Sequence, residues 1–364
     1  MRGEMNVQKD NKARLPWYAL FIKYRELGLI GIIILLVAVV SFVNPLFFTG
    51  EKMLFIVEDT AVMAILAAGM LCVMLVGSID ISISGIMALS AMVGGIVMRN
   101  NLVVTEVTQM VDGVETLVNL KTSTPLIWVI LIGIGVGGLC GLVNGAVIAY
   151  GNVLPIVTTL GMQYILYGIT HIVSNAQAVY KKDMSDVFVQ FTRAELWGVN
   201  SKTWIMIGVL IILYIFLTYF RTGRHLYAVG SNIEAAQMRG INSKRSILLA
   251  HIIMGAVAGL AGLMFASHDT KVTQDLKTGY EMYVIAACVI GGVSVTGGSG
   301  KVPGVLLGAL TIGVINNGLP MLKLTGSAEF WKKLIQGALI LIAVVSNVLM
   351  QRTMIRQNLR RRNI

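Results

Sequence analysis

Long apolar runs alternate with short polar segments along most of the chain. A helix needs about 20 mostly apolar residues to cross a bilayer, and runs of this kind predict about ten spans. They lie at 27–44, 53–77, 79–99, 125–149, 155–175, 203–220, 247–266, 282–298, 302–319 and 330–350. The pattern therefore predicts an all-α polytopic membrane protein. Its single transmembrane domain, 27–350, follows an N-terminal segment, 1–26, and precedes a basic tail, 351–364.

Two pairs of neighbouring spans are separated only by residues rich in Gly and Ser. Residues 77–85 read GSIDISISG, and residues 291–300 read GGVSVTGGSG. Each segment is typical of a helix that is interrupted inside the membrane. The two interruptions lie about five spans apart, so their orientations would be opposite. Broken helices at matching positions of two halves predict an inverted repeat with a solute path at its centre.

The composition excludes a soluble protein of this length. Hydrophobic residues make up 56 % of the chain, and only 13 % is charged, against roughly 25 % in soluble proteins. Mean hydropathy is +0.78. The net charge of +11 would suggest a nucleic-acid partner in a soluble chain. Here it indicates contact with membrane lipid and no nucleic acid.

The basic residues predict the orientation in the membrane. If the loops alternate between the two sides, the side of the N-terminus carries 17 of the 29 Lys and Arg residues. These residues are concentrated in 1–26, 221–246 and 352–364, next to the spans. By the positive-inside rule, both termini and the loop 221–246 are predicted to be cytoplasmic.

Asp80 is the acidic residue that this assignment places within an apolar stretch, and it has two interpretations. A charge in hydrocarbon is a functional candidate by default, here a coupling site for protons or sodium. Alternatively, Asp80 caps a half-helix near the cytoplasmic boundary, with Ser82 and Ser84 completing the turn. The structural interpretation is favoured, because an ion relay normally shows more than one such group.

Neutral polar residues within the spans offer a route for a hydroxylated solute. They are Asn144, Thr158, Thr159, Gln163, Asn316 and Asn317. The alternative for each one is a hydrogen bond between helices. Glycines at intervals of four predict close helix packing; they are Gly133, Gly137, Gly141 and Gly145, then Gly255 and Gly259, then Gly300, Gly304 and Gly308.

The cytoplasmic loop 221–246 predicts a short capped helix. Ser231 or Asn232 is a suitable N-cap, Glu234 falls in the first turn, and Gly240 ends the helix. Such a helix either rests on anionic lipid or docks a cytoplasmic partner. Residues 297–301 resemble a phosphate loop, but Val302 occupies the position of the required Ser or Thr. The chain is therefore predicted to hold no ATPase site, no catalytic residues, no metal and no cofactor of its own.

Four segments, in order, resemble those of a known family. They are Gly77–Gly85, in which Ser78 and Ser84 replace glycines; Gly141–Gly161; Gly230–Ala236 with Gly240 and Ile241; and Tyr280–Ser294 with Gly297–Gly300. Together they are similar to the permease subunits of bacterial ribose/galactoside-type ABC importers for simple sugars, in the branched-chain amino acid/ribose permease superfamily. The matches span roughly residues 60–350.

The resemblance implies a complex in the bacterial inner membrane. Two identical or similar permease subunits would surround a central path, a cytoplasmic ATPase would bind ATP and Mg²⁺, and an extracytoplasmic binding protein would deliver the solute. The outside segments 176–202 and 267–281 become candidates for contact with that protein. The coupling helix would lie within 231–241, with Ser231, Asn232, Glu234, Ala235, Ala236, Arg239 and Gly240.

The function implied is import of a sugar or sugar-like solute by alternating access, powered by the separate ATPase. An ion-coupled secondary transporter that uses Asp80 is the main alternative. A membrane scaffold or receptor without transport activity is disfavoured, because broken helices would have no task in it.

Overall fold

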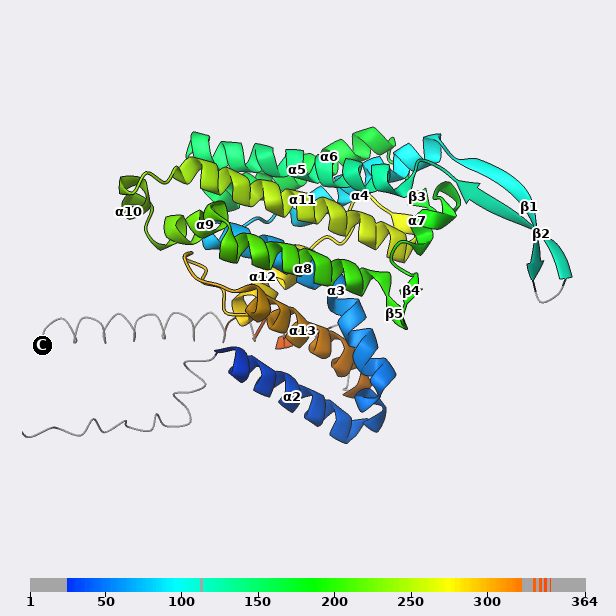
Figure 1. Cartoon of the computed structure of the whole chain (residues 1–364), viewed down its shortest axis with the longest axis horizontal. Helices are drawn as coiled ribbons and strands as arrows, with labels where there is room; N and C mark the ends of the chain where they lie inside the picture. The colour runs from blue at the N-terminus through cyan, green and yellow to red at the C-terminus, as the bar shows by residue number, and fades with distance from the viewer. Residues whose placement is uncertain are drawn as a thin grey trace, which may run out of the picture.

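The computed structural model describes residues 25–111 and 114–322, together with a few positions between 330 and 341. Eight helices in this part of the chain are long and apolar enough to cross a membrane, which confirms an all-α polytopic protein. They are α2 (Arg25–Val43), α3 (Gly50–Leu75), α4 (Ile83–Asn100), α5 (Leu126–Gly151), α6 (Pro155–Ser174), α8 (Ser201–Tyr219), α11 (Ser243–Asp269) and α13 (Val302–Gly318). These helices run side by side along the long axis of the molecule (Figure 1).

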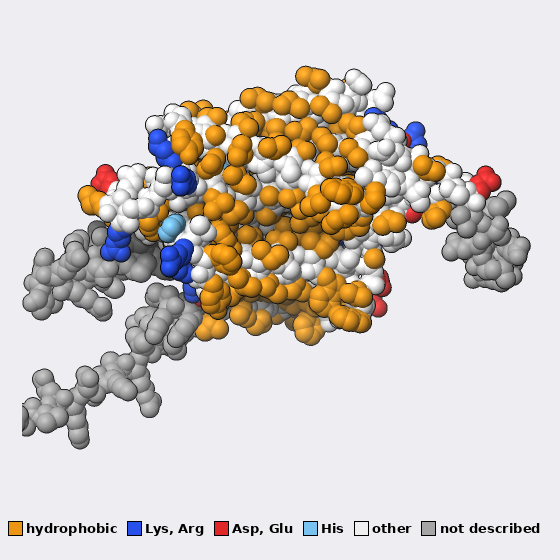
Figure 2. Space-filling model, turned by 45° about the horizontal axis from the view of Figure 1, so that its top comes forward, with side chains coloured by type: hydrophobic (Ala, Val, Ile, Leu, Met, Phe, Trp, Pro, Cys, Tyr) orange, Lys and Arg blue, Asp and Glu red, His pale blue; other side chains and the backbone are white. Residues whose placement is uncertain are grey.

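Helix α3 forms the centre of the bundle. In its most apolar stretch of 18 residues, 89 % of the residues are buried. The corresponding share is 22 % in α5 and in α6 and 11 % in α2. All four helices are strongly apolar, so what distinguishes them is the neighbour that each one packs against. Hydrophobic side chains cover the surface between the two ends of the molecule (Figure 2), as expected where lipid replaces water. We conclude that α3 is surrounded by protein while α2, α5 and α6 face the bilayer.

The two ends of the bundle carry different short elements. At one end lie an antiparallel hairpin that extends away from the helices, two small strand pairs and two short helices (Figure 1). These are β1 (Val103–Val111), β2 (Val114–Thr122), β3 (Val179–Tyr180), η2 (Lys181–Asp183), α7 (Asp186–Gln190), β4 (Glu195–Leu196), β5 (Val199–Asn200) and β6 (Lys271–Val272). The other end carries α9 (Arg221–Ser231) and α10 (Ile233–Met238). These two ends are called the hairpin end and the α9–α10 end below.

The prediction of a full span at 282–298 is wrong. The helix there, α12 (Tyr280–Ile290), has 11 residues, and at 1.5 Å per residue it is about 16 Å long. It ends where Gly292 adopts a φ of +93°, although no charged residue follows before Lys301. The expected span 330–350 lies largely outside the described residues, as do the tail 351–364 and all but the end of the segment 1–26.

Helices α4 and α12 both begin inside the bundle and run from there to opposite ends, and they are called the half-helices below. Helix α4 follows the non-helical residues 76–82 and runs to the hairpin end, whereas α12 follows residues 270–279 and runs to the α9–α10 end. This is the arrangement expected of an inverted repeat. The interruption that corresponds to 76–82 therefore precedes α12, and the predicted interruption at 291–300 is instead the turn from α12 into α13.

Closely packed glycines join α5 to α11. A Cβ atom at Gly137 would lie 2.1 Å from the carbonyl oxygen of Gly255, and one at Gly141 would lie 2.1 Å from that of His251. The backbones therefore meet directly, as the spacing predicted. In the same way Gly308 of α13 packs against Ala287 of α12. Gly300 does not belong to this second seam, because it lies in the loop before α13.

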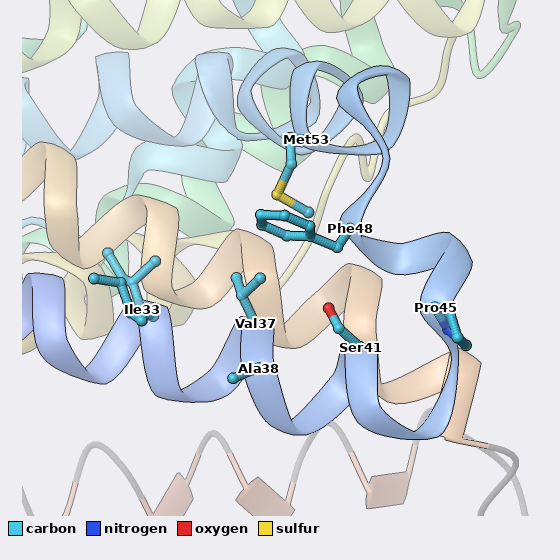
Figure 3. A pocket seen from close by; sticks show the side chains of 8 residues that line it. Ile33, Val37, Ala38, Ser41, Pro45, Phe48 and Met53 are labelled. Carbon is cyan, nitrogen blue, oxygen red and sulfur yellow. The ribbon is translucent and has the colours of Figure 1, made fainter.

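An apolar pocket of about 730 Å³ lies beside α2 (Figure 3). Its lining comes from α2, from η1 (Pro45–Phe48) and from the start of α3: Ile33, Ile34, Val37, Ala38, Ser41, Pro45, Phe48 and Met53. The hydroxyl of Ser41 is the one polar side-chain group in that lining. A pocket of this composition suits hydrocarbon and does not suit a polyhydroxylated solute.

Candidate functional site

The first turns of α4 and α12 meet inside the bundle. The one hydroxyl proton of Ser84 Oγ is shared between the carbonyl oxygen of Lys277, at 2.9 Å, and a carboxylate oxygen of Glu281. Gln163, which also contacts Glu281, lies eight residues into α6 and therefore about 12 Å along it. The meeting point thus lies well within the membrane-spanning part of the bundle. Two buried polar clusters surround it.

The first cluster surrounds Asp80. Its Oδ1 accepts hydrogen bonds from the backbone N–H and the hydroxyl of Ser82, at 2.9 and 2.6 Å. Its Oδ2 lies 3.3 Å from Nδ1 of His251 and 3.5 Å from Nδ2 of Asn144, and that amide also donates to Ser82 Oγ at 2.8 Å. All four side chains are fully buried. The cluster therefore ties the turn before α4 to both α5 and α11.

The second cluster surrounds Glu281. Its Oε1 accepts a hydrogen bond from Nε2 of Gln163 at 3.3 Å, and the same amide lies 3.3 Å from the hydroxyl of Tyr167. That hydroxyl lies 3.0 Å from Thr278 Oγ1. Glu281 is 5 % exposed, whereas Thr278 is exposed. A continuous set of polar groups, the Glu281 ladder, thus runs from the surface to the start of α4.

Glu281 has no Lys, Arg or His partner within ion-pair distance in the described part of the chain. Only neutral groups, Ser84 and Gln163, donate to its carboxylate. A buried carboxylate without a cation is costly in a membrane protein and marks a functional site by default. Its remaining acceptor capacity can be satisfied by the hydroxyl groups of a bound solute.

The structure brings three of the six predicted path residues to these clusters. Asn144 contacts Asp80, Gln163 contacts Glu281, and Thr159 Oγ1 accepts a hydrogen bond from the backbone N–H of Ile81 at 3.1 Å. The other three lie elsewhere. Thr158 Oγ1 donates to the carbonyl oxygen of Leu154, the N-cap residue of α6, at 3.2 Å. Asn317 Nδ2 donates to Asp59 Oδ2 at 3.0 Å, and Asn316 is half-buried beside Asn317 on α13.

Ser84 does not complete the Asp80 turn as expected, because its hydroxyl points to α12. Sequence reasoning also missed Glu281 and His251. Glu281 stands at the edge of an apolar run, where a charged residue normally marks a loop. His251 is fully buried against Asp80. Gly255 and Gly259 follow His251 at intervals of four residues, so the three residues share one face of the helix. Because glycines at this spacing predict close packing, the spacing could have shown that His251 is buried.

The predicted short helix is α10. Asn232 is its N-cap, because Asn232 Oδ1 accepts from the backbone N–H of Ala235 at 2.8 Å, while Ser231 is the last residue of α9. Gly240 adopts a φ of +79° beyond its end, and the N–H of Ile241 returns to the carbonyl of Ala236 at 3.0 Å. The exposed side chains Ile233 and Met238, at 45 % and 88 % exposure, give α10 an apolar surface at the end of the molecule.

A bundle of apolar helices that encloses two half-helices with buried polar groups is the architecture of a membrane transport protein. Comparison with known proteins defines its family. Residues 52–344 match the family described as branched-chain amino acid transport system / permease component, and the chain belongs to this family.

Several curated relatives align over most of the chain. The ribose import permease protein RbsC of Escherichia coli K12 is 31 % identical over 315 residues, covering 86 % of this chain and 90 % of that protein. The D-allose transport system permease protein AlsC of the same strain is 32 % identical and covers 93 % and 96 %. The galactose/methyl galactoside import permease protein MglC is 29 % identical and covers 89 % and 94 %. No solved structure matches the chain at a significant level.

Proposed function

We propose that this chain is the permease subunit of an ATP-driven importer that moves a sugar, or a similar polyhydroxylated solute, into the cytoplasm. The observation that carries the proposal is the Glu281 ladder. Carboxylate, amide, phenol and hydroxyl groups are arranged from the surface to the half-helix junction, and each can exchange hydrogen bonds with hydroxyl groups. The relatives support the solute class, because their names specify ribose, allose and galactose.

The solute path passes the half-helix junction. Gln163, Thr159 and Asn144 contribute from α5 and α6, together with Glu281, which sequence reasoning did not include. Thr158, Asn316 and Asn317 lie away from this junction. Asp80 and Ser82 hold the turn in place through Asn144 and His251 and do not contact the solute. The family does not favour the ion-coupled alternative.

The α9–α10 end is cytoplasmic and binds the ATPase. Lys and Arg side chains gather at this end (Figure 2), in agreement with the positive-inside rule; those near α9 and α10 are Arg221, Arg224, Arg239, Lys244 and Arg245. Helix α10 is the coupling element, and its exposed Ile233 and Met238 fill a groove of the ATPase. That partner binds ATP and Mg²⁺, and this chain contributes no ATPase site.

The remaining partners follow from the orientation. The extracytoplasmic binding protein contacts the hairpin end, through residues 176–202 and the outer part of 267–281. Glu281 itself is buried and is not part of that surface. A second permease subunit, identical or similar, completes the path. ATP-driven movement of α10 then alternates access to the half-helix junction between the two sides.

The proposal is tested by purifying the tagged chain in mild detergent, identifying its partners by mass, and assaying uptake of D-ribose, D-allose and D-galactose by cells. We expect a co-purifying ATPase subunit and uptake that stops when ATP is depleted. Recovery of the chain alone, with uptake that survives ATP depletion and collapses with the ion gradient, would contradict the proposal and favour the ion-coupled transporter.

A further inference from the structure

Helix α10 is joined to α9 by one residue. Asn232 N donates to the carbonyl oxygen of Ala228 in the last turn of α9, at 3.2 Å, and its Oδ1 accepts from Ala235 in the first turn of α10, at 2.8 Å. The residue therefore ends one helix and begins the next. Because both bonds are local and no flexible linker separates the helices, a movement of α10 must move the last turn of α9.

That last turn lies against two segments that are distant in sequence. A Cβ atom at Gly230 would lie 1.7 Å from the carbonyl oxygen of Leu75 and 2.6 Å from the backbone nitrogen of Gly298. Gly298 N in turn donates to that carbonyl of Leu75 at 2.9 Å. Three backbones thus meet at one point: the end of α3, the end of α9 and the loop between α12 and α13. Only glycine at position 230 permits this approach.

A second contact links α9 to the same loop. Tyr227, one turn before Gly230, donates from its hydroxyl to the carbonyl oxygen of Gly300 at 3.0 Å. Burial raises the pKa of Tyr227 to about 12, so the phenol remains protonated and remains a donor at physiological pH. On the other side of the loop, Gly297 packs against Gly77: a Cβ atom at Gly297 would lie 2.9 Å from the backbone nitrogen of Gly77.

We infer that Tyr227 and Gly230 are the positioning residues that transmit movement of α10 to both half-helices at once. The route to α4 leads from Leu75 through residues 76–82. The route to α12 leads through the loop 291–301, which directly follows Ile290, the last residue of α12. Both routes end at the contact between Ser84 and Glu281. The inference rests on the proposed function, in which α10 docks on the ATPase.

The physical basis is the stiffness of the contact. Backbone atoms packed at van der Waals distance cannot slide apart continuously, and packed interfaces shift between discrete arrangements. A side chain at position 230 would force the three backbones apart. Loss of the Tyr227 hydroxyl would free the loop on one side and leave the fold unaltered. Both changes would uncouple α10 from the half-helices without altering the surface that docks on the ATPase.

The test uses the whole complex, purified from membranes through a tag on this chain and reconstituted in liposomes. Thr278→Cys places a reporter on the exposed part of the Glu281 ladder, and its rate of maleimide labelling is measured in nucleotide-free and vanadate-trapped states. The native cysteines Cys72, Cys140 and Cys288 are buried and give little background. The test variants are Tyr227→Phe and Gly230→Ala. The controls are Tyr219→Phe, an exposed tyrosine, and Gly208→Ala, where a Cβ atom meets nothing within 4 Å.

We expect trapping to change the labelling rate severalfold in the wild type and in both controls. In Tyr227→Phe and Gly230→Ala the change should shrink to less than half of that, with the ATPase subunit still bound. The inference would be overturned if trapping changed the labelling rate of Tyr227→Phe as much as that of the wild type. It would also be overturned if trapping left the labelling rate of the wild type unaltered. If Gly230→Ala fails to fold, Tyr227→Phe decides the question. Failure of the proposed function is distinct, because no ATPase subunit would then co-purify with the wild type.

Discussion

Ser84, in the first turn of α4, donates a hydrogen bond to the carboxylate of Glu281, in the first turn of α12. The two residues are 197 positions apart in the chain, yet the half-helices that they begin run from this point to opposite ends of the bundle. Helix N-termini carry partial positive charge, and Glu281 lies in the first turn of α12 and beside that of α4. Its carboxylate therefore stabilises two helix starts that hydrocarbon would leave unpaired.

Replacing Glu281 should reduce both stability and transport. Glu281→Ala removes the carboxylate to which Ser84 Oγ and Gln163 Nε2 donate, at a cost of about 1–3 kcal/mol in the free energy of unfolding. Uptake should fall by about tenfold or more, because a lost contact of about 1.4 kcal/mol corresponds to a factor of ten. Thermal unfolding in detergent and uptake of labelled sugar measure the two effects.

Two further variants separate solute contact from folding. Glu281→Gln retains an acceptor for Ser84 and should recover most of the stability, but only part of the transport. Glu106→Gln, at an exposed position of strand β1, should change neither quantity. Wild-type uptake by a folded Glu281→Ala protein would remove Glu281 from the solute path.

Replacing Asp80 should affect stability and leave the energy source unaltered. Asp80→Asn weakens the contact with His251 and should cost about 1–3 kcal/mol, as expected when a buried hydrogen-bonded group loses its match. The remaining uptake should still require ATP and should resist a protonophore. Glu106→Gln, at the exposed position of β1, is again the control. Uptake that in the wild type follows the ion gradient, and that Asp80→Asn alone abolishes, would assign Asp80 to ion coupling.

The apolar pattern predicted the spans because the bilayer sets the length of a helix, and this constraint acts on each segment separately. It failed for α12, where no charged residue interrupts the sequence between Ile290 and Lys301 but Gly292 has a left-handed φ. The six polar residues predicted to line the path are all buried or half-buried, but the sequence does not show which of them lie together. Asn144 and Asn317 look alike in the sequence, and only the packing of α5, α6 and α13 decides which one lies near Asp80.

The glycine seam between α5 and α11 should tolerate no side chain at its centre. Gly137→Ala would place a methyl group 2.1 Å from the carbonyl oxygen of Gly255, and overpacking of this kind costs about 1–3 kcal/mol. Gly135→Ala, on the same helix, meets nothing within 4 Å and should leave the melting temperature in detergent unchanged or slightly raised. Equal melting temperatures for the two variants would show that α5 and α11 can move apart without loss of stability.

The docking role of α10 can be tested without perturbing the bundle. Met238 is 88 % exposed, so Met238→Glu should alter the stability of the isolated chain by less than about 0.5 kcal/mol. If Met238 is buried against the ATPase, the same change removes about 1.5–3 kcal/mol of apolar contact and buries a charge. The ATPase subunit should then be lost from the purified complex, while the chain keeps its melting temperature. Leu196→Glu, at an exposed apolar position of the hairpin end, is the matched control and should retain the ATPase. Retention by both variants would place the docking surface away from α10, and loss by both would show a general effect of added negative charge.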